Sequence, residues 1–299
     1  MNKYIHLLLL SCSLLLVGCG DRPEDRRARR ERRDDGWTNG ELVEKRQIQR
    51  SGEASLRLDI EYNGGYLELE RESTGLLADI YLEFDHEENR PIIDYDSSLA
   101  SPTLRIRSPR KHDGELSFKR FRDNRWHIKL SPQTPIDIRI DAGAIDSRLD
   151  FTDLKVEDLN INVGAGELQI EFNAPNTERP RISINSGAAS TEASGLCNAN
   201  FRRLEFNGGV GKAELSFEGE WKNEASVDLN LGVGSNTIFL PRHVGAKVRE
   251  SGSFLSPVSF RGFEKRGNVH YSENYDEATG SLDFDLKIGV GHTSFRWIK

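Results

Sequence analysis

The segments PIDIRIDAGAIDSRLDF (residues 135–151) and DLNINVGAGELQIEF (residues 158–172) are two copies of one pattern that returns along the rest of the chain. Each copy is centred on a glycine, and these glycines recur about every 22 residues, with one longer gap before the last copy. They are Gly143, Gly164, Gly187, Gly209, Gly232, Gly252 and Gly289. A fixed period of this length is typical of a protein built from stacked repeats.

Apolar residues flank each glycine at fixed offsets. They stand five and three residues before it and six and eight residues after it, and they alternate with polar residues, as in Ile138, Ile140, Leu149 and Phe151. Alternation with a period of two indicates a strand with one buried face. Each copy therefore predicts two half-buried strands that meet at a glycine corner.

Two more columns mark the corner. A second glycine follows the first by two residues in four copies, which suits a sharp turn that needs positive φ or close backbone approach. An aspartate or asparagine stands two residues before the first glycine in most copies, and we expect these side chains to hydrogen-bond from repeat to repeat. The predicted structural ladder and turn residues are Asp141, Asn162, Asn185, Asn207, Asn230, Gly164, Gly209, Gly232 and Gly289.

The repeats predict an all-β chain that forms a right-handed, β-helix-like solenoid with coils of about 22 residues. We expect the solenoid repeat domain at 136–299, with an insertion near 262–280 that accounts for the longer gap. Residues 42–135 also alternate between turn signals and predict an N-terminal β-domain or cap. A start of the solenoid within this region stays open, because Ile60, Tyr62, Asn63 and Gly65 match the repeat columns.

The end of the chain leaves two alternatives. No polar segment follows the last predicted strand, which ends at Phe295, Trp297 and Ile298. Terminal repeats need a cap against edge pairing. Either the insertion folds over this end, or the end pairs with another molecule, which would give self-association through the C-terminal coil.

The chain opens with MNKYIHLLLLSCSLLLVGC, in which the apolar run is short for a membrane span. The segment resembles the bacterial lipobox, which implies a signal peptide at 1–18, lipid on Cys19 and a charged tether at 19–41. An ordinary signal peptide with an incidental cysteine is the alternative. We expect a lipid-anchored protein of the bacterial cell envelope, periplasmic or surface-facing, with the outer membrane favoured because Gly20 replaces the aspartate of inner-membrane retention.

Nothing in the sequence indicates a cofactor or a reaction. The formal net charge of −7 argues against nucleic acid as a partner. Residues 208–212, GGVGK, lack the spacing of a phosphate-binding loop and lead into a predicted strand. The histidines show no paired spacing for a metal site. The acidic segments 85–88 and 94–96 could hold Ca²⁺, although a solvated loop pair is the preferred interpretation.

Residues 227–248, VDLNLGVGSNTIFLPRHVGAKV, and 282–295, LDFDLKIGVGHTSF, resemble the toast-rack domain of bacterial lipoproteins. They are also similar to the C-terminal domain of LiaF-type cell-wall stress proteins and to candidate adhesin domains. The resemblance covers residues 50–299, most specifically 204–299. It implies a β-solenoid without established catalytic activity and supplies no active-site motif. LiaF-type proteins carry membrane helices before this domain, and here a lipid anchor would replace them.

We therefore expect a non-catalytic, lipid-anchored envelope protein that acts as a scaffold, an adhesin-like module or an envelope-stress sensor. Its expected partners are the membrane, through lipid on Cys19, and an envelope protein or glycan. The alternative is a polysaccharide-binding or polysaccharide-cleaving β-helix protein. Cleavage would need carboxylates or a metal beside a basic residue on one face, whereas outward residues such as Arg139, Asn160 and Asp228 mix charges without a focus.

Overall fold

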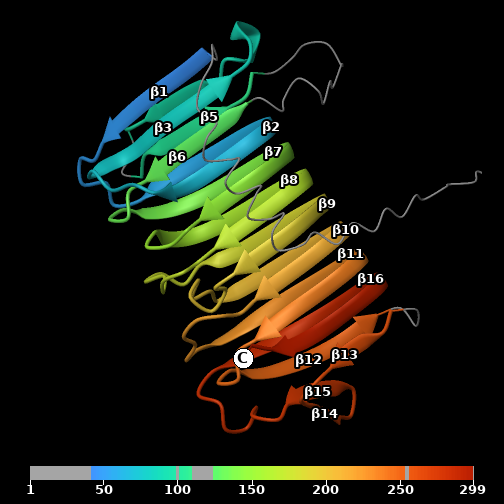
Figure 1. The fold of residues 1–299 in the computed structure, drawn as a ribbon. Coiled ribbons are helices and arrows are strands. Elements are labelled where there is room, and N and C mark those ends of the chain that lie inside the picture. Colours follow the sequence, from blue (N-terminus) through green and yellow to red (C-terminus); the bar gives the residue numbers. More distant parts are fainter. Residues whose placement is uncertain (1–41, 99–100, 110–123, 253–255, 299) are drawn as a thin grey trace, which may run out of the picture. The chain divides into compact units, whose positions relative to one another are not determined.

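The computed structural model describes residues 42–98, 101–109, 124–252 and 256–298. They belong to one compact unit, Glu41–Lys299. The unit is all-β apart from the short 3-10 helix η1 (Glu87–Asn89), and its strands form one large, mostly parallel sheet (Figure 1). The predicted signal peptide, Cys19 and the charged tether lie outside the described residues.

The centre of the sheet is a stack of long parallel strands. In stacking order they are β2 (Leu56–Arg71), β7 (Pro135–Asp150), β8 (Lys155–Glu171), β9 (Arg181–Ser194), β10 (Arg203–Ser216), β11 (Glu224–Leu240) and β16 (Ser281–Trp297). Like residues of the repeat are partners: Asn207 pairs with Asn185 on one side and with Asn230 on the other. The register thus aligns the sequence columns across the sheet.

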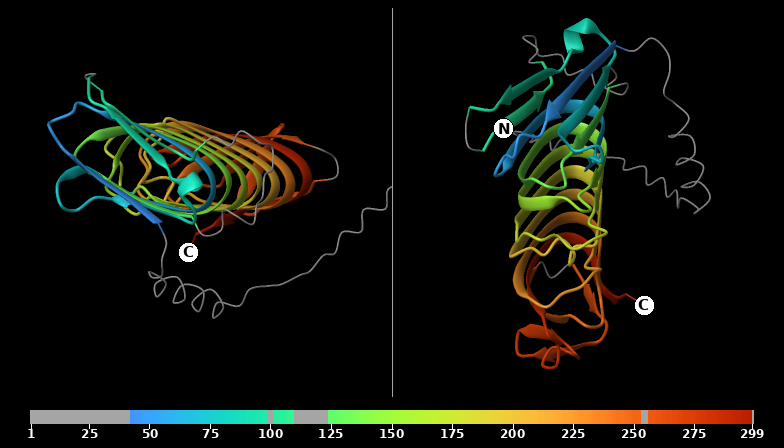
Figure 2. Two further views of the ribbon diagram at one scale, coloured as in Figure 1. Left: turned by 90° about the horizontal axis from the view of Figure 1, so that it is seen from above. Right: turned by 90° about the vertical axis from the view of Figure 1, so that its left-hand side faces the viewer.

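The two strands expected in each copy form a single strand that bends at the glycine corner. Figure 2 shows the long strands curving around the core. Pairing continues on both sides of the bend, as in Phe206 with Leu229 and Leu215 with Ile238. Only the central position itself is left out of the pairing, as between Gly208 with Leu231 and Val210 with Val233, so each copy remains one strand.

The core lies inside this bend. In β8, Ile161 and Val163 are buried before the corner and Leu168 and Ile170 after it, so the inward positions change from odd to even numbers where the chain turns. Aromatic side chains from neighbouring repeats stack within the core, as in Phe151 and Phe172, whose ring centroids lie 5.2 Å apart. One core cluster extends from Ile48 to Phe295, so the unit holds its own core.

Additional strands extend the sheet from the edge of β2 that lies opposite to β7. Both β5 (Thr103–Arg107) and β6 (Arg125–Leu130) pair with β2 in parallel. The antiparallel strands β4 (Ile92–Asp96), β3 (Leu76–Phe84) and β1 (Leu42–Gln49) extend the sheet from there. Since β2 also pairs with β7, hydrogen bonding crosses the expected domain boundary at residue 135.

The column assignment made from the sequence for β2 is wrong by two residues. Ile60 pairs with Ile140 and Glu61 with Asp141, so Glu61, and not Asn63, stands in the Asp/Asn column. The reason is the position of the bend. Gly65, with φ 128°, takes the place of the second corner glycine. Asn63 therefore stands at the central position beside Gly143, and the chain turns two residues earlier than the sequence assignment expected.

The C-terminal strand does not lie at the end of the sheet. β16 lies between β11 and β12 (Gly245–Gly252), and it also pairs with β13 (Val258–Phe260). The insertion forms β14 (Phe263–Arg266) and β15 (Val269–Ser272), which extend the sheet antiparallel to β12. Of the two alternatives, the insertion thus folds over this end. Trp297 donates from Nε1 to the Arg261 carbonyl oxygen over 2.7 Å.

Candidate functional site

An Asp/Asn ladder crosses the parallel strands just before their corners. Each asparagine Nδ2 donates to the Oδ1 of the preceding member, over 2.7 Å from Asn162 to Asp141, 2.7 Å from Asn185 to Asn162, 2.6 Å from Asn207 to Asn185 and 2.6 Å from Asn230 to Asn207. The structure brings all five predicted ladder residues together. We call Asp141, Asn162, Asn185, Asn207 and Asn230 the ladder.

Most ladder amides also donate a second hydrogen bond, from their other N–H, to a side chain of their own strand. Asn162 donates to Oδ1 of Asn160 over 2.9 Å, and Asn207 donates to Oε1 of Glu205 over 3.0 Å. Asn185 makes a longer contact of 3.5 Å to Oγ of Ser183. An amide has two N–H donors and an oxygen with two lone pairs. These three side chains are therefore saturated as donors, whereas each amide oxygen keeps acceptor capacity.

The central glycines leave no room for a side chain beside the ladder. A Cβ on Gly232 would lie 2.1 Å from the Gly209 carbonyl oxygen, and one on Gly209 would lie 2.3 Å from that of Gly187. The corresponding distances are 2.7 Å for Gly164 and 2.5 Å for Gly289. Close backbone stacking thus requires glycine here, and it leaves the surface hollow.

The hollow is a long groove that we call the ladder groove. It has a volume of about 1310 Å³ and runs from Glu61 on β2 to Lys287 and Gly289 on β16, with Ser251 of β12 at its far end. Its lining comes from the same three positions of every long strand: the position of the ladder, the central position and the residue between them. The central position is a glycine on all of these strands except β2, which has Asn63 there. Sequence reasoning found these columns but missed the groove, which exists only once the columns are stacked.

Charge in the groove is confined to its ends. Among the described lining residues the carboxylates are Glu61 and Asp141, which are register partners, and the cation is Lys287, the partner of Asn230. Partial burial alone would raise the pKa of Asp141, but hydrogen bonds from Arg139 and Asn162 outweigh it and lower that pKa from 3.8. Asp141 is therefore an anion at neutral pH and a poor proton donor for acid catalysis.

An apolar row, which we call the corner ridge, directly follows the glycines of the groove floor. Its members are mutual register partners: Ala144, Ala165, Ala188, Val210, Val233 and Val290. The three valines are 58%, 50% and 52% exposed, which is unusual for large apolar side chains in this protein. Sequence reasoning missed this row, although the residue that follows the central glycine is alanine or valine in each of these six copies.

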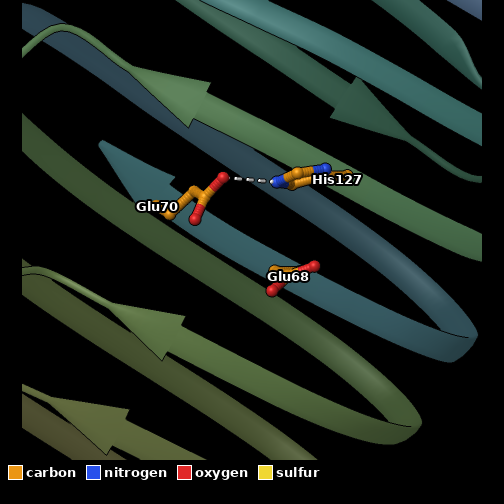
Figure 3. Close-up of side chains that lie close together, drawn as sticks. All are labelled: Glu68, Glu70 and His127. Carbon is orange, nitrogen blue, oxygen red and sulfur yellow. Dashed lines mark hydrogen bonds and ion pairs between the residues drawn. The ribbon is translucent and has the colours of Figure 1, made fainter. Parts of the chain in front are cut away.

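One cluster of potential metal ligands lies on the outer face of β2 and β6 (Figure 3). Ligand atoms of Glu68, Glu70 and His127 lie within 4.8 Å of one another. Glu70 already accepts from His127 over 2.9 Å and forms an ion pair with Lys129 at 3.0 Å. Burial would raise the pKa of Glu70, but these two partners lower it below 4.5. The cluster therefore carries its own cation, and we interpret it as an ion-pair network.

The other sequence candidates have protein partners. Within the acidic segments, Glu87 forms an ion pair with Arg90 at 2.9 Å, and Asp94 lies 4.0 Å from Arg105. Lys212, considered for phosphate binding, lies within β10 and pairs with Glu214 at 2.6 Å. These contacts favour a structural role for the two acidic segments and for residues 208–212.

Comparison with solved structures shows a shared fold. A candidate cell adhesion protein from Clostridium sporogenes matches with a TM-score of 0.52 and 19% identity, over 87% of this chain and all of that one. Candidate adhesins from Bacteroides fragilis and Parabacteroides distasonis match at TM-scores of 0.36 and 0.34, with 12% and 11% identity, over 87% and 85% of this chain and 98% and 97% of theirs. The Clostridium protein thus shares the all-β architecture described above.

No curated protein matches the chain. Among the described residues, no helix is long and apolar enough to cross a membrane. The model of the N-terminal domain of toast_rack, DUF2154, matches residues 38–194, more than half of the 299 residues. This match lies ahead of the segment 204–299, on which the sequence resemblance was most specific. The chain belongs to the family defined by the N-terminal domain of toast_rack.

Proposed function

We propose that this protein is a non-catalytic, adhesin-like binding module of the bacterial cell envelope, anchored by lipid on Cys19, and that it binds an extended polymer along the ladder groove. The observation that carries the proposal is the groove itself, which is lined by equivalent positions of seven successive parallel strands. A periodic surface of this kind fits a partner that is long and regular. The fold shared with a candidate cell adhesion protein is in keeping with this role.

The proposal includes the finer architecture. A right-handed solenoid with coils of about 22 residues agrees with the register, because like positions such as Ile161, Ile184, Phe206 and Leu229 are partners on neighbouring strands. Right-handed connection is nearly universal for parallel strands of one sheet. Such a body would stand on the charged tether in the periplasm or at the surface, with the outer membrane as the favoured site of the anchor.

Binding without turnover is favoured by the placement of the charged groups. Glu61 and Asp141 lie at the same end of the groove, and Lys287 lies at the other end. Cleavage at this carboxylate pair would need both groups free to act as acid, base or nucleophile, but both oxygens of Asp141 already accept hydrogen bonds, from Arg139 and from Asn162. The groove therefore suits binding better than cleavage, and a scaffold or sensor role would use the same contact.

Self-association at the C-terminal coil is the weaker part of the sequence prediction. β14 now forms that end of the sheet, and it carries Glu264, Lys265 and Arg266. Charged side chains on an edge strand oppose pairing with a second edge. We propose that the groove, and not this end, is the main contact surface.

Sedimentation with isolated cell envelopes tests the proposal. The unit 41–299 should bind saturably, and Val233→Asp, which places a carboxylate beside the groove floor, should weaken binding at least ten-fold. Ile92→Asp is the matched control, because Ile92 is also exposed, at 43%, but lies on β4 away from the groove. Equal binding by Val233→Asp and the wild type would refute a groove-centred function.

A further inference from the structure

The ladder groove offers hydrogen-bond acceptors in a regular row. The amide oxygens of Asn162, Asn185 and Asn207 each accept one bond from the next ladder residue and keep a second lone pair. The N–H groups of the same amides are already used inside the protein. A complementary partner must therefore bring donors, and hydroxyl groups meet that need.

The spacing of the acceptors is set by the sheet. Neighbouring strands lie about 4.8 Å apart, so the seven strands that line the groove span roughly 29 Å. This step is close to the length of one β-1,4-linked sugar unit. A straight glycan laid across β8 to β11 would therefore meet an equivalent amide oxygen with each successive sugar.

The corner ridge supplies the second kind of contact that a sugar needs. A pyranose ring has hydroxyl groups at its rim and C–H groups on its faces. The exposed methyl groups of Val210, Val233 and Val290 directly follow the lining glycines. They can contact the C–H face while the ladder oxygens accept from the rim, so one chain satisfies both rows.

The distribution of charge along the groove favours a neutral glycan over an acidic one. Between the acidic end, with Glu61 and Asp141, and the basic end at Lys287, the described lining residues of β8 to β11 are uncharged. An acidic polysaccharide would bring one or more carboxylates to a stretch that has no cation to pair with them, which costs desolvation energy. The middle of the groove thus matches an uncharged chain.

We propose that the ladder groove binds a neutral, extended, β-1,4-linked polysaccharide whose hydroxyl groups donate to the ladder oxygens and whose ring faces contact the corner ridge. This inference rests on the proposed function, because it names the chemical class of the polymer. It narrows the sequence alternative of a polysaccharide-binding protein to neutral glycans.

Calorimetry with the unit 41–299 tests the inference, with β-1,4-linked oligomers of glucose and of N-acetylglucosamine, two to eight units long, as probes. We expect the dissociation constant to fall with each added unit and to level off at about six or seven units, the span of the seven strands. Val233→Asp should raise it at least ten-fold and Ile92→Asp should not. Fully O-methylated glucose oligomers should not bind, since they lack donors.

Three results would overturn the glycan inference: no binding of either series, affinity independent of length, or equal binding of the O-methylated oligomers. The envelope experiment separates this failure from failure of the proposed function. If envelopes still bind in a Val233-dependent manner, the groove has another polymer as its partner and only the glycan inference falls. If Val233→Asp changes neither assay, both fall.

Discussion

Asn162 donates from Nδ2 to Oδ1 of Asp141 over 2.7 Å, and every later ladder contact points the same way. The amide dipoles are therefore aligned along the stack. At one end the row meets the Asp141 carboxylate, and at the other Asn230 has Lys287 as its register partner. The Asp141 carboxylate can only accept, so it fixes the direction of the row, and aligned hydrogen bonds strengthen one another.

Replacing a central ladder residue should destabilise the stack. Asn185→Leu removes the bond to Asn162 and the bond from Asn207, so we expect the free energy of unfolding to fall by about 1–3 kcal/mol. Urea unfolding of the unit 41–299 measures the change. Ser190→Leu, at an exposed position of the same strand, is the control. An unchanged urea midpoint for Asn185→Leu would show that the ladder contributes nothing to stability.

The glycine column makes a steric prediction. A Cβ on Gly232 would lie 2.1 Å from a backbone oxygen, so Gly232→Ala should cost about 3 kcal/mol or more through overpacking. Gly267 has φ 67° and open space around it, and Gly267→Ala should cost only about 1–2 kcal/mol of backbone strain. Urea unfolding compares the two variants. Equal losses would mean that neighbouring strands can separate to admit a methyl group.

Two positions of β10 test the assignment of inside and outside. Leu215 is 2% exposed and Val210 is 58% exposed. Leu215→Asp buries an unpaired carboxylate and should lower the free energy of unfolding by several kcal/mol, about 4 or more. Val210→Asp should change it by less than about 0.5 kcal/mol. Thermal melting of both variants is the measurement, and a reversed order would invert the two faces of the strand.

Glu72 predicts an acid-sensitive turn between β2 and β3. Its buried carboxylate accepts from the backbone N–H groups of Gly75, at 2.7 Å, and Leu76, at 3.0 Å, and from Thr74. Burial would raise the pKa of Glu72, but these bonds lower it below 4.5. The stabilisation is therefore complete above pH 4.5 and is lost as the pH falls through the lower folded pKa.

Glu72→Gln should accordingly cost about 1–3 kcal/mol at pH 7, because an amide replaces one acceptor oxygen with a donor. The difference from the wild type should shrink as the pH falls below the folded pKa. Urea unfolding at a series of pH values gives this profile. Glu220→Gln, whose side chain is 82% exposed in the wild type, should show no such dependence. A constant difference across the series would contradict the assignment.

The sequence predicted the features that recur within each repeat. The alternation around Ile140 and Ile161, and the asparagine beside each glycine, follow directly from the period, and the structure places these columns in register. The repeat pattern does not give the order in which the strands stack. Gly252 and Gly289 both fit the central column by sequence, and no local feature tells which of their strands lies next to β11. The assignment of Gly252 is wrong by one residue, because β12 pairs it with Ile288.

The candidate site was only partly predictable for the same reason. The ladder could be named residue by residue, but its groove depends on how far the glycine backbones approach across strands. Glu70 and His127 meet because β6 pairs with β2, and the period is lost between those strands in the sequence. Lipidation of Cys19 and the domain boundaries remain sequence predictions.

The position of β16 has a consequence for how the protein is made. A polypeptide leaves the ribosome from its N-terminus, so the segment of β12 emerges well before its parallel neighbour, β16. The growing chain can add repeats one at a time only as far as β11. Completion of the sheet beyond β11 must then wait for the final residues, and a prematurely terminated product would lack the strand that joins β12 and its hairpin to the rest of the sheet.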